Sequence, residues 1–332
     1  MKAIVYSSYG PPDVLRLEDI PKPTPGDDEV VIQVRASTVN PADWHFMRGT
    51  PYLIRLTSGL SKPRITQLGI DVAGEVETVG RNVVQFKPGD HVFGWCRGAF
   101  AEFTRIPASA IVTKPANVTF EQVACVPVAA VTALQGLRDK GRIQPGQKVL
   151  INGASGGVGT FAVQIAKSFG AEVTGVCSTG NVEMVQSIGA DRVIDYTREN
   201  FTEGEQRYDL ILDNAGNHSL SAVRRVLRPK GRYVQVGGPD KGQWVGPMTA
   251  PLKAVVFSRF VSQKFVMFIA SGNRDDMTTL SDLMQAGKVT PVIDRRYALS
   301  EVADAIRYLE EGHARGKVVI TVAHNEEVDI GS

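Results

Sequence analysis

The sequence predicts an α/β protein with a doubly wound parallel sheet, preceded by a small, partly open β-barrel. Three observations support this fold class. The chain has 332 residues, enough for two domains. Short strand-like segments separated by glycine and proline fill roughly the first 120 residues, as is typical of a barrel. From Lys148 onward, apolar strands alternate with helical segments, which favours parallel pairing with right-handed crossovers.

The elements of the first half are expected to be short strands. No helix with a full apolar stripe is expected before about Phe120. Strands are predicted at residues 1–6, 30–34, 71–79 and 90–93.

The second half is expected to begin with a long helix over residues 121–137, rich in Ala and Val. The strands that follow are predicted at residues 149–151, 172–177, 193–195, 210–212, 233–236 and 317–322. The helices between and after them are predicted at residues 161–169, up to about Ser187, at 278–286 and at 300–311.

The composition excludes several classes of function. The chain has 37 Lys and Arg against 35 Asp and Glu, with no dense basic patch, so nucleic acid is not an expected partner. Its three cysteines are scattered, which fits a reducing compartment. The start lacks the apolar stretch of a signal peptide, and no segment supplies the roughly 20 apolar residues of a membrane span. We therefore expect a cytoplasmic protein without a membrane partner.

A glycine loop between a predicted strand and a predicted helix is the strongest motif. Residues 152–159 read Asn-Gly-Ala-Ser-Gly-Gly-Val-Gly. Such glycines let the backbone approach a pyrophosphate, and the helix N-terminus offers free N–H groups to it. The strand–loop–helix–strand context supports a dinucleotide site. The expected contacts in the loop are Ser155, Gly156, Gly157 and Val158.

Other interpretations of this loop stay open. Residues 153–157 also match the Gly-x-Ser-x-Gly nucleophile elbow of serine hydrolases, with Ser155, Asp213 and His313 in the required order. A phosphate-binding P-loop would need a Lys before Ser or Thr, which is missing. A glycine-rich turn without a ligand is the remaining alternative.

The end of the next strand indicates which dinucleotide is bound. An NAD site normally has Asp or Glu there, which holds the ribose hydroxyls. This chain has Ser178 and Thr179 instead, two hydroxyls that can donate to a 2′-phosphate. We therefore expect NADPH. No arginine stands beside the hydroxyls, because Gly180 follows, and Arg198 is the candidate from the next loop.

Several motifs together resemble the medium-chain dehydrogenase/reductase superfamily, in its zinc-free quinone oxidoreductase branch. They occur in the family's order over nearly the whole chain, at residues 39–43, 69–74, 87–92, 153–159, 236–238 and 316–319. The resemblance implies a GroES-like catalytic domain made of residues 1–123 and 271–332. A Rossmann domain of residues 124–270 would be inserted between these two parts.

The positions of the catalytic zinc ligands differ from those of the zinc-dependent relatives. The resemblance assigns them to Asn40, Ile70 and Val128, and none of these can ligate zinc in the usual manner. The structural four-cysteine lobe is also missing, so we expect no metal. Without a Lewis acid, hydride transfer requires an electron-poor acceptor. Quinones and α,β-unsaturated carbonyl compounds meet that requirement, because hydrogen bonds can stabilise the anion that forms.

The resemblance also implies roles for single residues. Asn40 would offer its amide to the substrate or the cofactor, Asp43 would be a supporting acid, and Lys317 would approach Asp43 and the cofactor phosphates. His45 would relay a proton, although Ala42 replaces the hydroxyl that would connect it. The further cofactor contacts expected are Thr132, Tyr196, Asn214, Val236, Gly237, Phe268, Ile269 and Ala270.

The sequence thus predicts an NADPH-dependent, zinc-independent reductase of quinones or enones. The alternative in another class is a nucleotide-bound sensor or interaction protein that kept the fold without turnover; a serine hydrolase is the third. A homodimer is also expected, because the end of the apolar segment 255–270 should form the last, exposed strand of the parallel sheet.

Overall fold

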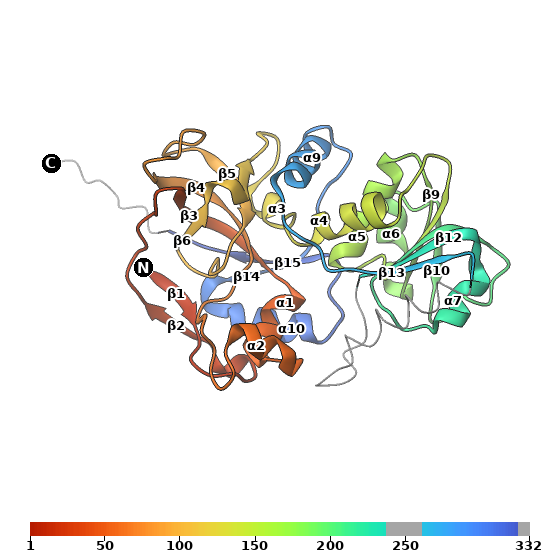
Figure 1. Cartoon of the computed structure of the whole chain (residues 1–332), viewed down its shortest axis with the longest axis horizontal. Helices are drawn as coiled ribbons and strands as arrows, with labels where there is room; N and C mark the ends of the chain where they lie inside the picture. The colour runs from red at the N-terminus through yellow and green to blue at the C-terminus, as the bar shows by residue number, and fades with distance from the viewer. Residues whose placement is uncertain (237–260, 325–332) are drawn as a thin grey trace.

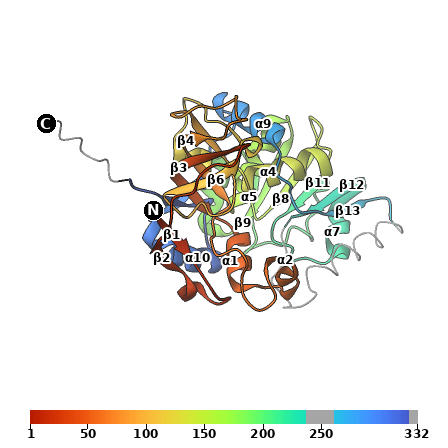
Figure 2. The same ribbon diagram turned by 60° about the vertical axis from the view of Figure 1, so that its left-hand side comes forward.

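The computed structural model describes residues 1–236 and 261–324. Within these ranges the chain forms a six-stranded parallel sheet flanked by helices and a seven-stranded mixed sheet that curves into a barrel (Figure 1). The predicted fold class is therefore confirmed. In the rotated view of Figure 2, the barrel strands lie on the left and the end of the parallel sheet on the right.

The parallel sheet has the strand order β10-β9-β8-β11-β12-β13. Its chain order reverses between β8 and β11, and ligands of doubly wound sheets bind at the carboxyl ends of the strands beside such a reversal. The strands are β8 (Lys148–Asn152), β9 (Glu172–Cys177), β10 (Arg192–Asp195), β11 (Tyr208–Asp213), β12 (Leu227–Gln235) and β13 (Lys264–Met267).

Helices cover both faces of this sheet, so alternate residues of its strands belong to different cores. Val149 and Ile151 of β8 pack with α4 (Ala129–Gln135) and α5 (Gly157–Ser168), while Leu150 packs with α7 (Leu220–Val226). The short helix α6 (Val182–Ser187) contributes Val185 to the first of these cores.

The mixed sheet has the order β14-β15-β3-β4-β5-β7, with β6 paired to β3. Because β15 pairs antiparallel with β3, residues from both ends of the chain share this sheet. The predicted boundaries at residues 123 and 271 stay a prediction. The strands are β3 (Glu29–Val39), β4 (Asp71–Val79), β5 (His91–Trp95), β6 (Phe103–Pro107), β7 (Ile111–Thr113), β14 (Ile293–Ala298) and β15 (Lys317–Thr321).

The remaining elements surround the barrel. A two-stranded antiparallel sheet joins β1 (Lys2–Val5) to β2 (Arg16–Asp19). Helix α10 (Val302–Glu310) packs its apolar side into the barrel core, and α9 (Arg274–Gln285) packs against α4. No helix in the described part of the chain is long and apolar enough to cross a bilayer.

One expectation about helices was wrong. The helix predicted over residues 121–137 is broken into α3 (Phe120–Ala124) and α4, since Pro127 has no N–H to continue the first helix. The barrel half also contains two short helices, α1 (Pro41–Arg48) and α2 (Arg55–Ser58), which the sequence did not indicate. Helix α1 shows no apolar stripe in the sequence, because it buries only Asp43 and Met47.

Candidate active site

The glycine loop has the geometry of a phosphate-binding turn. Gly153 has a φ of 75°, and a Cβ on Gly159 would lie 2.0 Å from the Gly153 carbonyl oxygen, so both positions require glycine. Gly156 precedes α5 without a side-chain cap. The N-terminus of α5 therefore presents backbone N–H groups that no side chain satisfies, an arrangement that favours an anion.

The C-terminal part of the chain lies directly against this loop. Gly316 forms an isolated β-bridge with Gly156, and its N–H donates to the Ser155 carbonyl at 2.9 Å. A Cβ on Gly157 would lie 3.3 Å from Cδ of Lys317. The glycine loop of one sheet thus contacts the start of β15 in the other.

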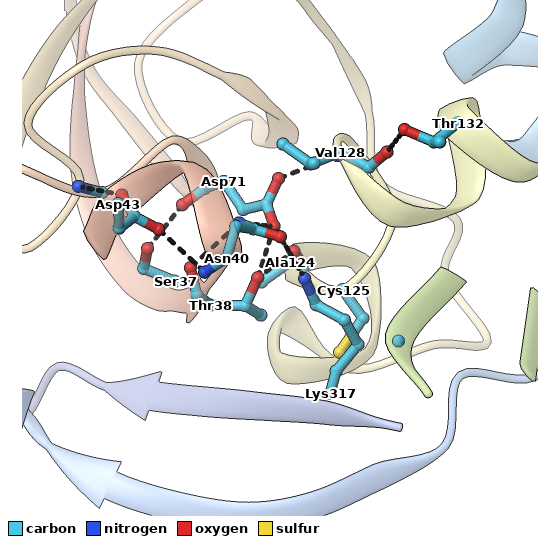
Figure 3. Close-up of polar contacts among 12 residues, drawn as sticks. Ser37, Thr38, Asn40, Asp43, Asp71, Ala124, Cys125, Val128, Thr132 and Lys317 are labelled. Carbon is cyan, nitrogen blue, oxygen red and sulfur yellow. Dashed lines mark hydrogen bonds and ion pairs between the residues drawn. The ribbon is translucent and has the colours of Figure 1, made fainter. Parts of the chain in front are cut away.

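A buried polar cluster lies where β3, β4, β15 and α4 meet, and the Asp71 carboxylate is at its centre (Figure 3). The carboxylate accepts hydrogen bonds from the Thr38 hydroxyl, from Nδ2 of Asn40 at 2.8 Å and from the Val128 N–H at 2.9 Å. Lys317 Nζ lies 3.3 Å from Asp71 Oδ2 and donates to Asn40 Oδ1 at 2.6 Å. Both charged side chains are almost fully buried, Asp71 at 0% and Lys317 at 3% exposure. In an ion pair this deeply buried, removing either charge leaves the other without a counter-ion.

The cluster refines one sequence-based interpretation and corrects another. The ion pair of Lys317 is with Asp71, although Lys317 also lies near enough to Asp43 for its charge to act to lower the pKa of that carboxyl. The Asn40 amide does not point a spare donor at a substrate, because Nδ2 donates to both Asp71 and the Thr38 carbonyl. Asp71 was missed as a functional residue. Its sequence signal was a carboxylate at the start of a strand, directly before the apolar Val72 and Ala73, which must be paired if it is buried.

Asp43 and His45 lie on α1, on the barrel side of the cluster. The Asp43 carboxylate accepts the N–H groups of Asn40 at 2.8 Å and of Gly69 at 3.0 Å, and so ties α1 to the loop before β4. Burial raises the pKa of Asp43 to about 7, assisted by the nearby Asp71 and opposed by these two N–H donors. His45 is half-buried, and its Nδ1 lies 2.9 Å from the Thr50 carbonyl. A neutral imidazole in this contact carries its proton on Nδ1.

The turn after β9 differs from the expectation of two free hydroxyls. The Thr179 hydroxyl donates to Asp195 at 2.6 Å, so it has no proton left for a phosphate. The Ser178 Oγ accepts a hydrogen bond from Asn181 Nδ2 at 3.0 Å. Its own hydroxyl proton has no acceptor among the described residues and can be donated to a ligand. The same amide group approaches Ser155 Oγ at 3.3 Å. Asn181, which the sequence analysis missed, thus joins the glycine loop to the end of β9.

The turn after β11 is fixed by a second buried carboxylate. Asp213 accepts hydrogen bonds from Asn152 Nδ2, from the N–H groups of Ala215 and Gly216, and from the Tyr233 hydroxyl at 2.7 Å. This holds Asn214 at the carboxyl edge of the sheet. Val236 follows β12 at the same edge, and Gly237 lies outside the described residues.

The other predicted contacts are spread over this edge and its neighbourhood. Tyr196 is 61% exposed just after β10. The Thr132 hydroxyl donates to the Val128 carbonyl at 2.6 Å within α4. Phe268 packs against the apolar core beside α4, Ala270 is half-buried, and Ile269 is 96% exposed. The structure therefore places these residues without testing their contact with a ligand.

The residues fit a dinucleotide better than a hydrolytic triad. Among residues 1–236 and 261–324, no donor reaches the buried Oδ1 atoms of Asn181 and Asn214, and a nucleotide bound along this edge could satisfy both. Among the described residues, neither Ser155 nor Asp213 forms a hydrogen bond with His313, so the hydrolase arrangement is not assembled. In the same ranges, no group of three or more His, Cys, Asp or Glu is placed to hold a metal ion.

Comparisons with known proteins agree with this geometry. A family model described as alcohol dehydrogenase GroES-like domain matches residues 26–116, and one described as zinc-binding dehydrogenase matches residues 188–320. Two curated relatives are each 34% identical over 96% of this chain and 79% of their own length. They are the 2-methylene-furan-3-one reductase of Solanum lycopersicum and the chloroplastic NADPH-dependent alkenal/one oxidoreductase of Arabidopsis thaliana.

A solved structure is similar over almost the whole chain. The quinone oxidoreductase of Coxiella burnetii superposes with a TM-score of 0.85 at 30% identity, covering 97% of this chain and 99% of its own. Its fold therefore corresponds to both sheets described above.

Proposed function

Because the chain belongs to the medium-chain dehydrogenase/reductase superfamily, in its quinone oxidoreductase-like branch, we propose that it is an NADPH-dependent, zinc-independent reductase of quinones or α,β-unsaturated carbonyl compounds. At the coarser level it is an oxidoreductase of this superfamily with a nicotinamide cofactor. The partner in the reaction is a small electron-poor acceptor, and the compartment proposed is the cytoplasm, in keeping with three cysteines outside disulfides.

The observation that carries zinc independence is the Asp71 cluster. Asn40 and Val128, two positions that zinc relatives use for ligands, both donate to the Asp71 carboxylate here. Asp71 already has a counter-ion in Lys317. Amide and aliphatic side chains are poor zinc ligands. The side chains of Asn40 and Val128 therefore favour a site that works without zinc.

The roles of the chain's own residues follow from their positions. The N-terminus of α5 and its glycines would hold the pyrophosphate, and Ser178 and Asn181 would hold the adenosine ribose. The chemistry that a reduced nicotinamide would supply there is hydride donation. The Asp71 cluster positions Asn40 and the start of α4, which carries Thr132, beside the reacting centre. Backbone N–H groups would stabilise the oxyanion, and the proton that completes the reaction would come from solvent or through His45.

Purified protein with NADPH and a panel of acceptors tests this function. We expect turnover with a simple quinone or an enone and none with a primary alcohol and NADP. Dialysis against a strong chelator should leave turnover unchanged. Activity that disappears with the metal would overturn zinc independence. NADPH binding without turnover on any acceptor would favour the sensor alternative.

We also propose a homodimer that joins the parallel sheets through β13. This strand is the last one on its side of the described sheet and pairs there with β12. An unpaired edge can pair with a second copy about a twofold axis. Light scattering at micromolar concentration should give a mass near twice the 35.9 kDa of one chain, and Val266→Arg should give monomers. A wild-type mass of one chain would exclude the dimer.

A further inference from the structure

Two neighbourhoods of different charge adjoin the turn after β9, where the adenosine end of the cofactor would lie. The first is a pocket of about 600 Å³ whose lining includes Thr179, Gly180 and the charged residues Glu183, Asp195, Arg198 and Glu199. Three carboxylates and one guanidinium therefore line the pocket, and Glu199 is also paired with Arg192 at 3.8 Å. Arg198 is also paired with Asp195 at 3.4 Å. The pocket is a poor environment for a phosphate, because its charge is negative.

The second neighbourhood contains Arg315, from the segment that leads into β15. A Cβ built on Gly180 would lie 3.6 Å from Nη2 of Arg315. Any larger residue at position 180 would therefore meet the guanidinium. Within the described ranges, no carboxylate forms an ion pair with Arg315. Its charge is available to an anion, unlike that of Arg198.

Backbone contacts hold Arg315 in this place. Its own N–H donates to Asp294 Oδ2 at 2.9 Å, and Asp294 also accepts from the Tyr308 hydroxyl at 2.6 Å. The next residue, Gly316, donates a backbone hydrogen bond to the Ser155 carbonyl of the glycine loop. The position of Arg315 is therefore set relative to the nucleotide-binding loop, although the side chain itself is exposed.

Polar groups suited to a phosphorylated ribose flank Gly180 on the same turn. Ser178 Oγ accepts from Asn181, which leaves its proton free to donate to a phosphate oxygen. Asn181 Oδ1 is buried without a donor, and a ribose hydroxyl could supply one. Ser155, which contacts Asn181, connects this group to the helix N-terminus.

We propose that Arg315 recognises the 2′-phosphate of NADPH, together with the Ser178 hydroxyl, and that the acidic pocket beside Arg198 is not the phosphate site. This inference rests on the proposed function and names the specificity residue that the sequence did not indicate. A planar guanidinium can donate two parallel hydrogen bonds to a phosphate. Since Arg315 precedes a barrel strand while Ser178 follows a strand of the parallel sheet, the phosphate would be held by both parts of the chain.

The test uses calorimetric titration of the full chain with 2′,5′-ADP and with 5′-AMP, which differ only in the 2′-phosphate. Wild type should bind 2′,5′-ADP at least about tenfold more tightly. In Arg315→Gln this ratio should fall to within about threefold of unity, with the affinity for 5′-AMP unchanged, and Arg315→Lys should keep part of it. Arg198→Gln is the matched control and should keep the wild-type ratio.

The outcomes separate this inference from the function on which it rests. A wild-type ratio retained in Arg315→Gln overturns the role of Arg315 while leaving the NADPH-dependent function intact. A ratio lost in Arg198→Gln instead places the phosphate in the acidic pocket. If wild type binds neither nucleotide, the nicotinamide-dependent function fails, and the inference fails with it.

Discussion

Replacing Asp71 with leucine is expected to lower the free energy of unfolding by about 3–5 kcal/mol. The substitution introduces a larger, uncharged side chain and leaves the Lys317 ammonium buried without its counter-ion. It also removes the acceptor of the Thr38 hydroxyl, the Asn40 amide and the Val128 N–H. Each unsatisfied buried donor adds to the cost.

A double-mutant cycle separates the ion pair from the other contacts. Lys317→Met should also destabilise strongly, because it leaves the Asp71 carboxylate uncompensated. The combined Asp71→Leu/Lys317→Met variant removes both charges and should be more stable than the sum of the single losses predicts. Denaturant unfolding followed by circular dichroism measures all three variants.

An exposed ion pair supplies the control. Arg81 contacts Asp27 at 2.5 Å with side-chain exposures of 77% and 50%, so Arg81→Ala should cost no more than about 1 kcal/mol. If Asp71→Leu costs as little as Arg81→Ala, or if the double variant shows simple additivity, the buried ion pair does not contribute the stability expected of it.

The regular elements could be predicted because their signals are local. Strands β4 and β9 begin and end at the predicted residues, since apolar patterning and flanking turn residues determine them. The break at Pro127 has a local signal too, but composition alone favoured a continuous helix. Helix α1 lacks an apolar stripe, and its local signals are confined to its ends, where Asn40 and Asp43 form a capping box and Gly49 is the C-cap.

The candidate site was predicted as a set of residues but not as a set of contacts. Asn40 and Lys317 were both expected in it, yet the partner of Lys317 is 246 positions away in the sequence. The sequence carries no distance between such residues, and the choice of Asp43 rested on the family resemblance alone. Arg315 was missed for the same reason. Its neighbour in space, Gly180, was interpreted as a position without an arginine.

The second large effect is expected at Ser178, the one residue of the predicted hydroxyl pair whose proton is still free. Wild type should bind NADPH at least about tenfold more tightly than NADH, about 1.4 kcal/mol. An aspartate at this position would put a charge next to the 2′-phosphate, where like charges a few ångströms apart repel by several kcal/mol. The same carboxylate would accept hydrogen bonds from the ribose hydroxyls of NADH.

Ser178→Asp should therefore reverse the preference, with a change in the ratio of the two dissociation constants of about a hundredfold or more. Ser178→Asn is the control, because it has nearly the same size as aspartate without the charge, and it should weaken NADPH binding only modestly. Fluorescence titrations at two ionic strengths add a further check, since salt screens an exposed charge and should reduce the effect of aspartate but not that of asparagine. If Ser178→Asp and Ser178→Asn keep the same preference for NADPH, the 2′-phosphate does not lie against Ser178, and the adenosine end must bind elsewhere along the edge formed by β9 and β10.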